Sequence, residues 1–99
     1  MANIGSFTSV ENGFTGRLIT ATINLPVDIR KLDGATEAGP HYRAYNGAAE
    51  IGAGWIKEAK ASGNEYVSLR LDDPSFPQTI HANLYIQQDQ SWNLVWERR

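Results

Sequence analysis

Turn signals divide this chain into short alternating segments, and their spacing constrains the fold more than any other feature of the sequence. Residues 4–10 (IGSFTSV) are followed by Asn12-Gly13, a pair that supplies the positive φ values of a tight hairpin turn. Residues 14–25 (FTGRLITATINL) form the next candidate strand, which ends at Pro26 because proline cannot donate to a ladder. Segments of this length, rich in β-branched and aromatic residues, indicate antiparallel strands.

The next two segments are harder to interpret. Residues 26–40 contain two prolines, two glycines and mixed charge without periodicity, so we predict a long loop there. Residues 52–71 (GAGWIKEAKASGNEYVSLRL) fit either a helix followed by a strand or a hairpin. The EAKA stretch favours a helix, but the two glycines and the turn-like ASGNE favour a hairpin, and we predict the hairpin, with its turn near residues 62–64.

The C-terminal part reads as a meander. Residues 79–87 and 92–98 alternate between apolar and polar side chains on either side of QDQS, and a proline-bounded connection, DDPSFPQ, precedes them. We therefore predict an all-β fold: a single small antiparallel domain, residues 1–99, of about six or seven strands. Since exposed sheet edges have to be covered or closed, a sandwich or a half-open barrel is expected rather than a flat sheet.

Composition excludes several classes of protein. The 99 residues contain no cysteine, which removes disulfides and thiolate chemistry and fits a reducing compartment, so a cytoplasmic location is expected. The N-terminus has no basic stretch followed by an apolar run, and no run of eighteen apolar residues occurs, so neither secretion nor membrane spanning is expected. A net charge of −2 with interspersed signs disfavours a basic duplex-binding domain.

Catalytic and metal-binding motifs are not recognised in the sequence. The two histidines, His41 and His81, lie in different contexts, and a triad drawn with Asp73 and Ser75 has little weight because triads are defined by geometry. The pair Asp72-Asp73 is better explained by turn formation than by a cation. Zinc spacing and a phosphate-binding loop are absent as well. No enzyme activity, cofactor or metal is expected.

Strand alternation predicts which residues share a face. One set is apolar and forms the predicted core face: Val67, Leu69, Leu71, Ile80, Ala82, Leu84, Ile86, Trp92, Leu94 and Trp96. On the complementary face, an antiparallel register aligns Arg70 with His81, Ser68 with Asn83, and Tyr66 with Tyr85. The same register on the preceding strand places Trp55 and Lys57 beside Ser68 and Tyr66.

This complementary face has three interpretations. In the first, its aromatic rings stack on bases while its cations neutralise phosphates. In the second, this face or the Arg98-Arg99 terminus contacts a protein partner. In both cases the binding residues on the face are Trp55, Lys57, Tyr66, Arg70, His81 and Tyr85. The alternative is an ordinary solvated sheet surface, with Trp55 packed into the core against Gly52 or Gly54.

The segments MANIGSFTSVENGFTGRL, EIGAGWIK, YVSLRLDDPSFP with IHANL, and LVWERR resemble, in this order, the bacterial proteins catalogued as domain of unknown function 736. The resemblance spans nearly the whole chain. It implies a small cytosolic protein, often encoded on conjugative plasmids and integrative elements, with no assigned activity, so no catalytic residue carries over. We expect a non-enzymatic accessory protein of mobile genetic elements that binds a protein partner, either a transfer or maintenance factor or a host-defence component. The alternative is a single-stranded nucleic-acid-binding module.

Overall fold

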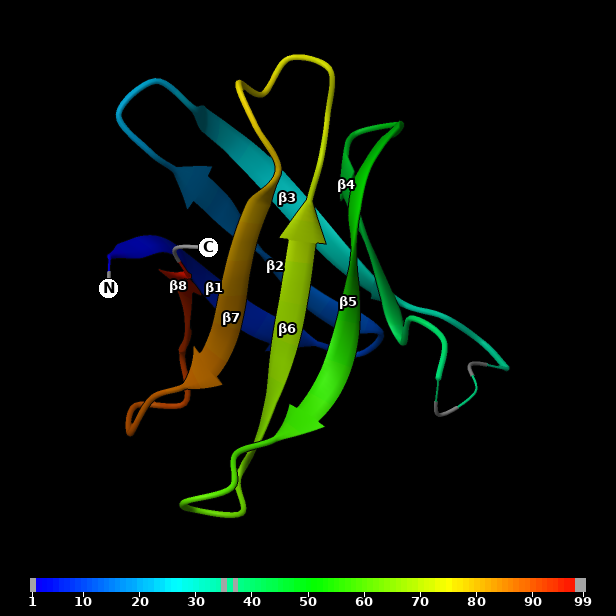
Figure 1. Ribbon diagram of the computed structural model, residues 1–99, viewed down its shortest axis with the longest axis vertical. Helices are drawn as coiled ribbons and strands as arrows, with labels where there is room; N and C mark the ends of the chain where they lie inside the picture. The colour runs from blue at the N-terminus through cyan, green and yellow to red at the C-terminus, as the bar shows by residue number, and fades with distance from the viewer. Residues whose placement is uncertain (1, 35, 37, 98–99) are drawn as a thin grey trace.

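Eight antiparallel strands form a closed barrel in the computed structural model, which describes residues 2–34, 36 and 38–97. Each strand pairs with its neighbours in chain order, and the last strand pairs with the first, so no edge is left open. Figure 1 shows the strands winding around the barrel in sequence order. The strands are β1 (Asn3–Val10), β2 (Gly13–Ile19), β3 (Asn24–Lys31), β4 (Tyr42–Asn46), β5 (Ala49–Glu58), β6 (Glu65–Leu71), β7 (Ile80–Ile86) and β8 (Trp92–Trp96).

The all-β, single antiparallel architecture predicted from the sequence is confirmed, with eight strands rather than six or seven. The hairpin is confirmed as well: β5 and β6 pair over seven positions, and Gly63 turns the chain between them with a φ of 73°. A helix therefore does not form in this segment. Of EAKA, residues 58–61, only Glu58 belongs to β5; the other three residues lie in the turn, where the Gly63 N–H donates to the Ala59 carbonyl.

The predicted loop at residues 26–40 is too long, because β3 runs to Lys31 and already contains Pro26. The Lys31 N–H donates to the Asn12 carbonyl, so odd-numbered residues of β3 bond to β2 and Pro26 faces the other side. The ladder on that side, with β4, extends only to Asp28, so the missing N–H of Pro26 costs no ladder bond. The strand predicted over residues 14–25 is correspondingly divided by a turn between β2 and β3.

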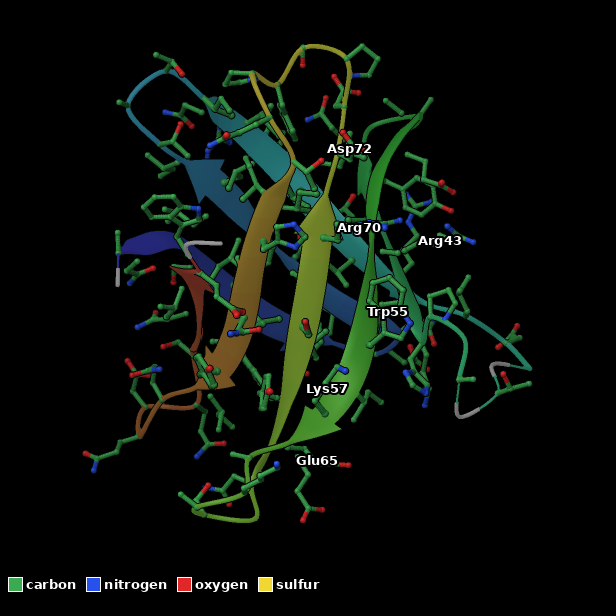
Figure 2. The ribbon with its side chains drawn as sticks, viewed as in Figure 1. Arg43, Trp55, Lys57, Glu65, Arg70 and Asp72 are labelled. Carbon is green, nitrogen blue, oxygen red and sulfur yellow. The ribbon has the colours of Figure 1, made fainter. Side chains whose placement is uncertain are left out.

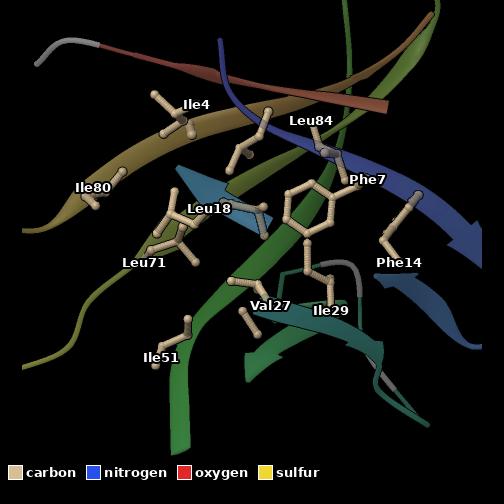
Figure 3. Packing of buried hydrophobic residues seen from close by; sticks show 14 of the residues in the cluster. Ile4, Phe7, Phe14, Leu18, Val27, Ile29, Ile51, Leu71, Ile80 and Leu84 are labelled. Carbon is tan, nitrogen blue, oxygen red and sulfur yellow. The ribbon is translucent and has the colours of Figure 1, made fainter. Parts of the chain in front are cut away.

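The barrel is filled by apolar side chains rather than by a channel. Phe7, 1% exposed, lies in the middle of the packed cluster with Leu18, Ile29 and Leu84 around it (Figure 3). The predicted core face is confirmed for most of its members: Val67, Leu69, Leu71, Ile80, Ala82, Leu84 and Leu94 are buried. Trp92 and Trp96 are half-buried and pack against this cluster, whereas Ile86 is 45% exposed because it lies at the end of β7.

Glycines on the inner surface make room for large neighbours. A Cβ at Gly16 would come within 2.7 Å of the Phe7 ring and 2.2 Å of the Ser6 carbonyl oxygen. A Cβ at Gly54 would lie 2.7 Å from a methyl carbon of Leu69. In a barrel this narrow, large side chains on one strand require small residues on the next, which explains glycines inside strands despite their low β propensity.

No helix in the described part of the chain has the length and apolar character needed to cross a membrane.

Candidate functional site

The outward side chains of β5, β6 and β7 form the candidate site, which we call the β5–β7 face: Trp55, Lys57, Tyr66, Arg70, His81 and Tyr85. Its register is the predicted one. Trp55 lies opposite Ser68 and Lys57 opposite Tyr66, while Ser68 and Arg70 lie opposite Asn83 and His81. Figure 2 shows Trp55, Lys57 and Arg70 on the same side of these strands. All six predicted residues therefore belong to one surface. The Arg98-Arg99 terminus lies outside the described residues.

Trp55 lies on the outside of the barrel and is half-buried, because Gly52 and Gly54, not Trp55, occupy the inward positions opposite Leu71 and Leu69. The Arg70 guanidinium carbon lies 5.9 Å from the centre of the Trp55 ring, within the range of a cation–π contact. Among the described residues, no carboxylate lies within ion-pair distance of Arg70. Its guanidinium is therefore available to an anionic ligand.

A depression with a volume of about 530 Å³ lies over this part of the face. Four of the predicted residues line it, Trp55, Lys57, Arg70 and His81, together with Ala38 and His41, which were not predicted as site residues. The Ile56 N–H donates to Nδ1 of His41 over 3.1 Å, which fixes the imidazole beside Trp55. The volume of the depression lies within the range of small-ligand sites. Its lining is polar, however, and the depression is open to solvent, as expected of a surface that binds an extended chain.

Tyr66 and Tyr85 lie outside the depression, nearer the end of the barrel at which β6 begins. Their ring centres are 5.2 Å apart, and the ring planes are tilted by 37°. Both side chains are half-buried, so each ring keeps a part open to solvent.

Asn83 differs from the other outward residues of β6 and β7, because it is only 8% exposed. Its side-chain nitrogen donates to Oε2 of Glu97 over 3.1 Å.

Basic residues also extend across the strands beyond the predicted set. Arg30 of β3 lies opposite Arg43 of β4, Ala53 of β5 lies between Arg43 and Arg70, and Arg70 lies opposite His81. We call Arg30, Arg43, Arg70 and His81 the basic row. Arg30 and Arg43 were not predicted as site residues, because no strand was expected over Tyr42–Asn46 and residue 30 fell within the predicted loop. The alternation of Arg43 with Tyr42 and Ala44 was the available signal.

Two members of the basic row have acidic neighbours. Asp28 lies 4.0 Å from Arg30, and Glu50 lies 3.5 Å from Arg43, all with exposed side chains. Ion pairs this exposed stabilise a protein by about 1 kcal/mol at most. Like charges directly opposite one another in a sheet are destabilising, but Arg30 gains a compensating contact, since its guanidinium carbon lies 4.7 Å from the centre of the Tyr45 ring.

The triad drawn from Asp73, Ser75 and His81 is not assembled as a hydrogen-bonded unit. Both the N–H and the hydroxyl of Ser75 donate to Oδ2 of Asp73, which closes a local turn, and His81 lies on the outer surface of β7. These bonds lower the pKa of Asp73, with the side-chain hydroxyl as the larger cause. Within the described residues, no group of three or more histidine, aspartate and glutamate side chains is arranged to hold a metal ion.

Fold and site together define a small closed antiparallel β-barrel whose outer surface carries an aromatic and basic face. The chain belongs to the family described as "Protein of unknown function (DUF736)", whose model matches residues 3–99. This match confirms the resemblance found in the sequence. No curated protein and no solved structure matched the chain.

Proposed function

We propose that this protein acts by binding rather than by catalysis, and that its ligand is a single-stranded nucleic acid lying across the β5–β7 face. The observation that carries the proposal is the basic row, which crosses strands β3 to β7 next to half-buried aromatic rings. Surfaces that bind single strands without strong sequence preference combine these two elements, because cations follow the backbone while rings stack on bases.

The spacing of the face suits such a ligand. Neighbouring strands lie about 4.8 Å apart, so a nucleic-acid backbone running perpendicular to the strands meets Arg43, Arg70 and His81 in succession. Outward residues two positions further along a strand lie about 7 Å away, which places Trp55 beside the row and Tyr66 one step beyond it. Bases that project to this side of the backbone therefore reach the rings.

A protein partner on the same face is the second candidate. Two observations favour it: the net charge is −2, and Arg30 and Arg43 each have a carboxylate beside them, which weakens the attraction of a polyanion. Tryptophan, tyrosine and arginine, the residues of this face, also dominate the energetics of protein interfaces. In either case we propose a cytoplasmic accessory protein of mobile genetic elements. A protein partner would be a transfer or maintenance factor or a component of host defence.

Fluorescence anisotropy tests the nucleic-acid proposal with labelled poly-dT and a mixed-sequence RNA, first at low salt and then near physiological salt. Changing Tyr66 and Tyr85 together to Ala is expected to weaken binding by about 1–3 kcal/mol per lost stacking contact. Arg70→Ala is expected to lower the slope of log affinity against log salt concentration by about 0.7, the value for one neutralised phosphate on a single strand.

Arg17→Ala provides the matched control, since Arg17 faces outward from β2, four strands away from β6 in this barrel. Its affinity and salt slope should equal those of the wild type. No binding of either probe at about 100 µM protein and low salt, the upper end of the non-specific range, would overturn the proposal and leave the protein partner. Affinity capture from the native host, with and without nuclease treatment, would then identify that partner.

A further inference from the structure

The end of the barrel at which β6 and β8 begin holds a second, smaller cavity, which shares only Tyr66 with the β5–β7 face. Its volume is about 170 Å³, and it is lined by Phe14, Tyr42, Ile56, Glu65, Tyr66, Val67 and Trp92. We call it the mouth cavity. Apart from Glu65, its lining is aromatic or aliphatic. A cavity of this size takes a chemical group rather than a whole drug-sized ligand, for which about 300–1,000 Å³ is usual.

Three aromatic rings meet in the mouth cavity, in one tilted and one edge-to-face contact. Phe14 lies 5.7 Å from Tyr42 with a tilt of 52°, and 4.9 Å from Trp92 with a tilt of 65°. Phe14 is only 6% exposed and forms the floor, whereas Tyr42 and Trp92 are half-buried and form walls. The face of an aromatic ring carries negative charge density, so such an arrangement attracts a cation that is weakly hydrated.

Carboxylates add negative charge at the same position. Glu65 lines the cavity and lies opposite Glu58 in the register of β5 and β6. Within the described part of the chain, neither carboxylate has a basic group within ion-pair distance. The charge of Glu65 also reaches the Tyr42 hydroxyl: the pKa of Tyr42 is raised, first by burial and second by Glu65.

We propose that the mouth cavity binds an organic ammonium group, with its methyl groups against the rings of Tyr42, Trp92 and Phe14 and its charge next to Glu65. A methylated ammonium combines an apolar surface with a positive charge, which is the chemistry that this lining complements. A hard metal ion would need several oxygen ligands, and the cavity offers one carboxylate. The ammonium group is either a free small quaternary amine or the methylated lysine side chain of a protein.

The first experiment compares choline with its uncharged carbon isostere, 3,3-dimethylbutan-1-ol. Both are titrated into the intact protein while the indole N–H resonance of Trp92 is followed by NMR. Choline is expected to shift this resonance saturably, and the alcohol, which has the same shape without the charge, is expected to bind at least about tenfold more weakly. Equal affinities, or no saturable shift with choline up to about 100 mM, would overturn the proposal.

Two variants, one in the first residue of β6 and one just after its last residue, locate the charge. Glu65→Gln is expected to weaken choline binding about two- to fivefold, the effect of a solvent-exposed ion pair. Asp72→Asn makes the same change in charge at the opposite end of β6 and is expected to bind as the wild type does (Figure 2). Glu65 is exposed, so its replacement leaves the packing of the barrel unchanged. Unaltered choline affinity in Glu65→Gln would contradict the assignment.

Peptides distinguish the two sources of the ammonium group. The affinity of a peptide containing trimethyllysine is measured beside those of the unmethylated peptide and of choline. The trimethyllysine peptide should bind more tightly than choline if the natural ligand is a protein, and about as tightly as choline if the natural ligand is a free amine. Preference for the unmethylated lysine would overturn the proposal, because it would mean that charge alone, without the rings, determines binding. None of these measurements depends on nucleic-acid binding, so the two proposals fail or succeed separately.

Discussion

The inner and outer faces of β5 to β7 differ in what determines their residues. On the inner face, Leu69, Leu71 and Leu84 are at most 2% exposed, and the facing glycines of β5 are required by the space that Leu69 and Leu71 occupy. On the outer face, Lys57 and Arg70 are exposed, and many polar residues would satisfy the same backbone. Packing therefore explains the inner residues, whereas it does not select the identity of the outer ones.

The largest expected effect tests the inner side of this comparison. Phe7→Ala should lower the free energy of unfolding by about 3–5 kcal/mol, because Phe7 fills the centre of the barrel against Gly16 and the cavity left behind cannot collapse. Urea denaturation of the variant and of the wild type measures the difference. Arg70→Ala, on the outer face, is the control and should change stability by less than about 1 kcal/mol. Equal losses in the two variants would remove the distinction between the faces.

The sequence predicted the parts of the barrel that depend on local alternation. In β6 and β7 the apolar residues recur at every second position, so both the buried face and the pairing of Arg70 with His81 could be predicted. Closure could not, because the pairing of Gly5 with Leu94 joins the two ends of the chain and leaves no local signal.

The candidate site was predictable to the same degree. The β5–β7 face followed from alternation, but the basic row also needs Arg30 and Arg43, whose strands have weak signals. Pro26 argues against β3, and β4 has only five residues. The mouth cavity was not predictable at all, since it brings together Phe14, Tyr42, Glu65 and Trp92 from four strands through the curvature of the barrel.

A smaller effect tests whether the outer face contributes to stability. The rings of Tyr66 and Tyr85 are 5.2 Å apart, and a cross-strand aromatic pair of this kind is worth about 0.5–1.5 kcal/mol. A double-mutant cycle with Tyr66→Ala and Tyr85→Ala should give a coupling energy in this range. The corresponding cycle between Tyr66 and Arg17, on opposite sides of the barrel, should give a coupling near zero. A tyrosine coupling above about 2 kcal/mol would mean that the pair is structural, and would weaken the case for binding.

The smallest expected effect concerns Tyr42, where the inner and outer environments meet. Burial and the charge of Glu65 raise its pKa, so the folded protein retains the phenol proton in a pH range in which the unfolded chain, with an ordinary pKa of about 10, has lost it. The stabilisation from this difference is therefore complete below pH 10 and is lost as the pH rises through the raised pKa of the folded state. Tyr42→Phe, which cannot lose this proton, should lack this part of the alkaline decline in the free energy of unfolding.

Glu65→Gln separates the two causes of that shift. Because burial is the larger cause, the pKa of Tyr42 should fall only part of the way towards its ordinary value when the carboxylate is removed. The ¹³Cζ resonance of Tyr42, followed from pH 8 to 12 in both proteins, measures the change directly, and Asp72→Asn at the far end of β6 controls for the loss of a negative charge elsewhere. A Tyr42 pKa that is identical in wild type and Glu65→Gln would show that the carboxylate does not act on this ring. The mouth cavity would then be an apolar recess like the rest of the inner surface, with no charge to select a cation.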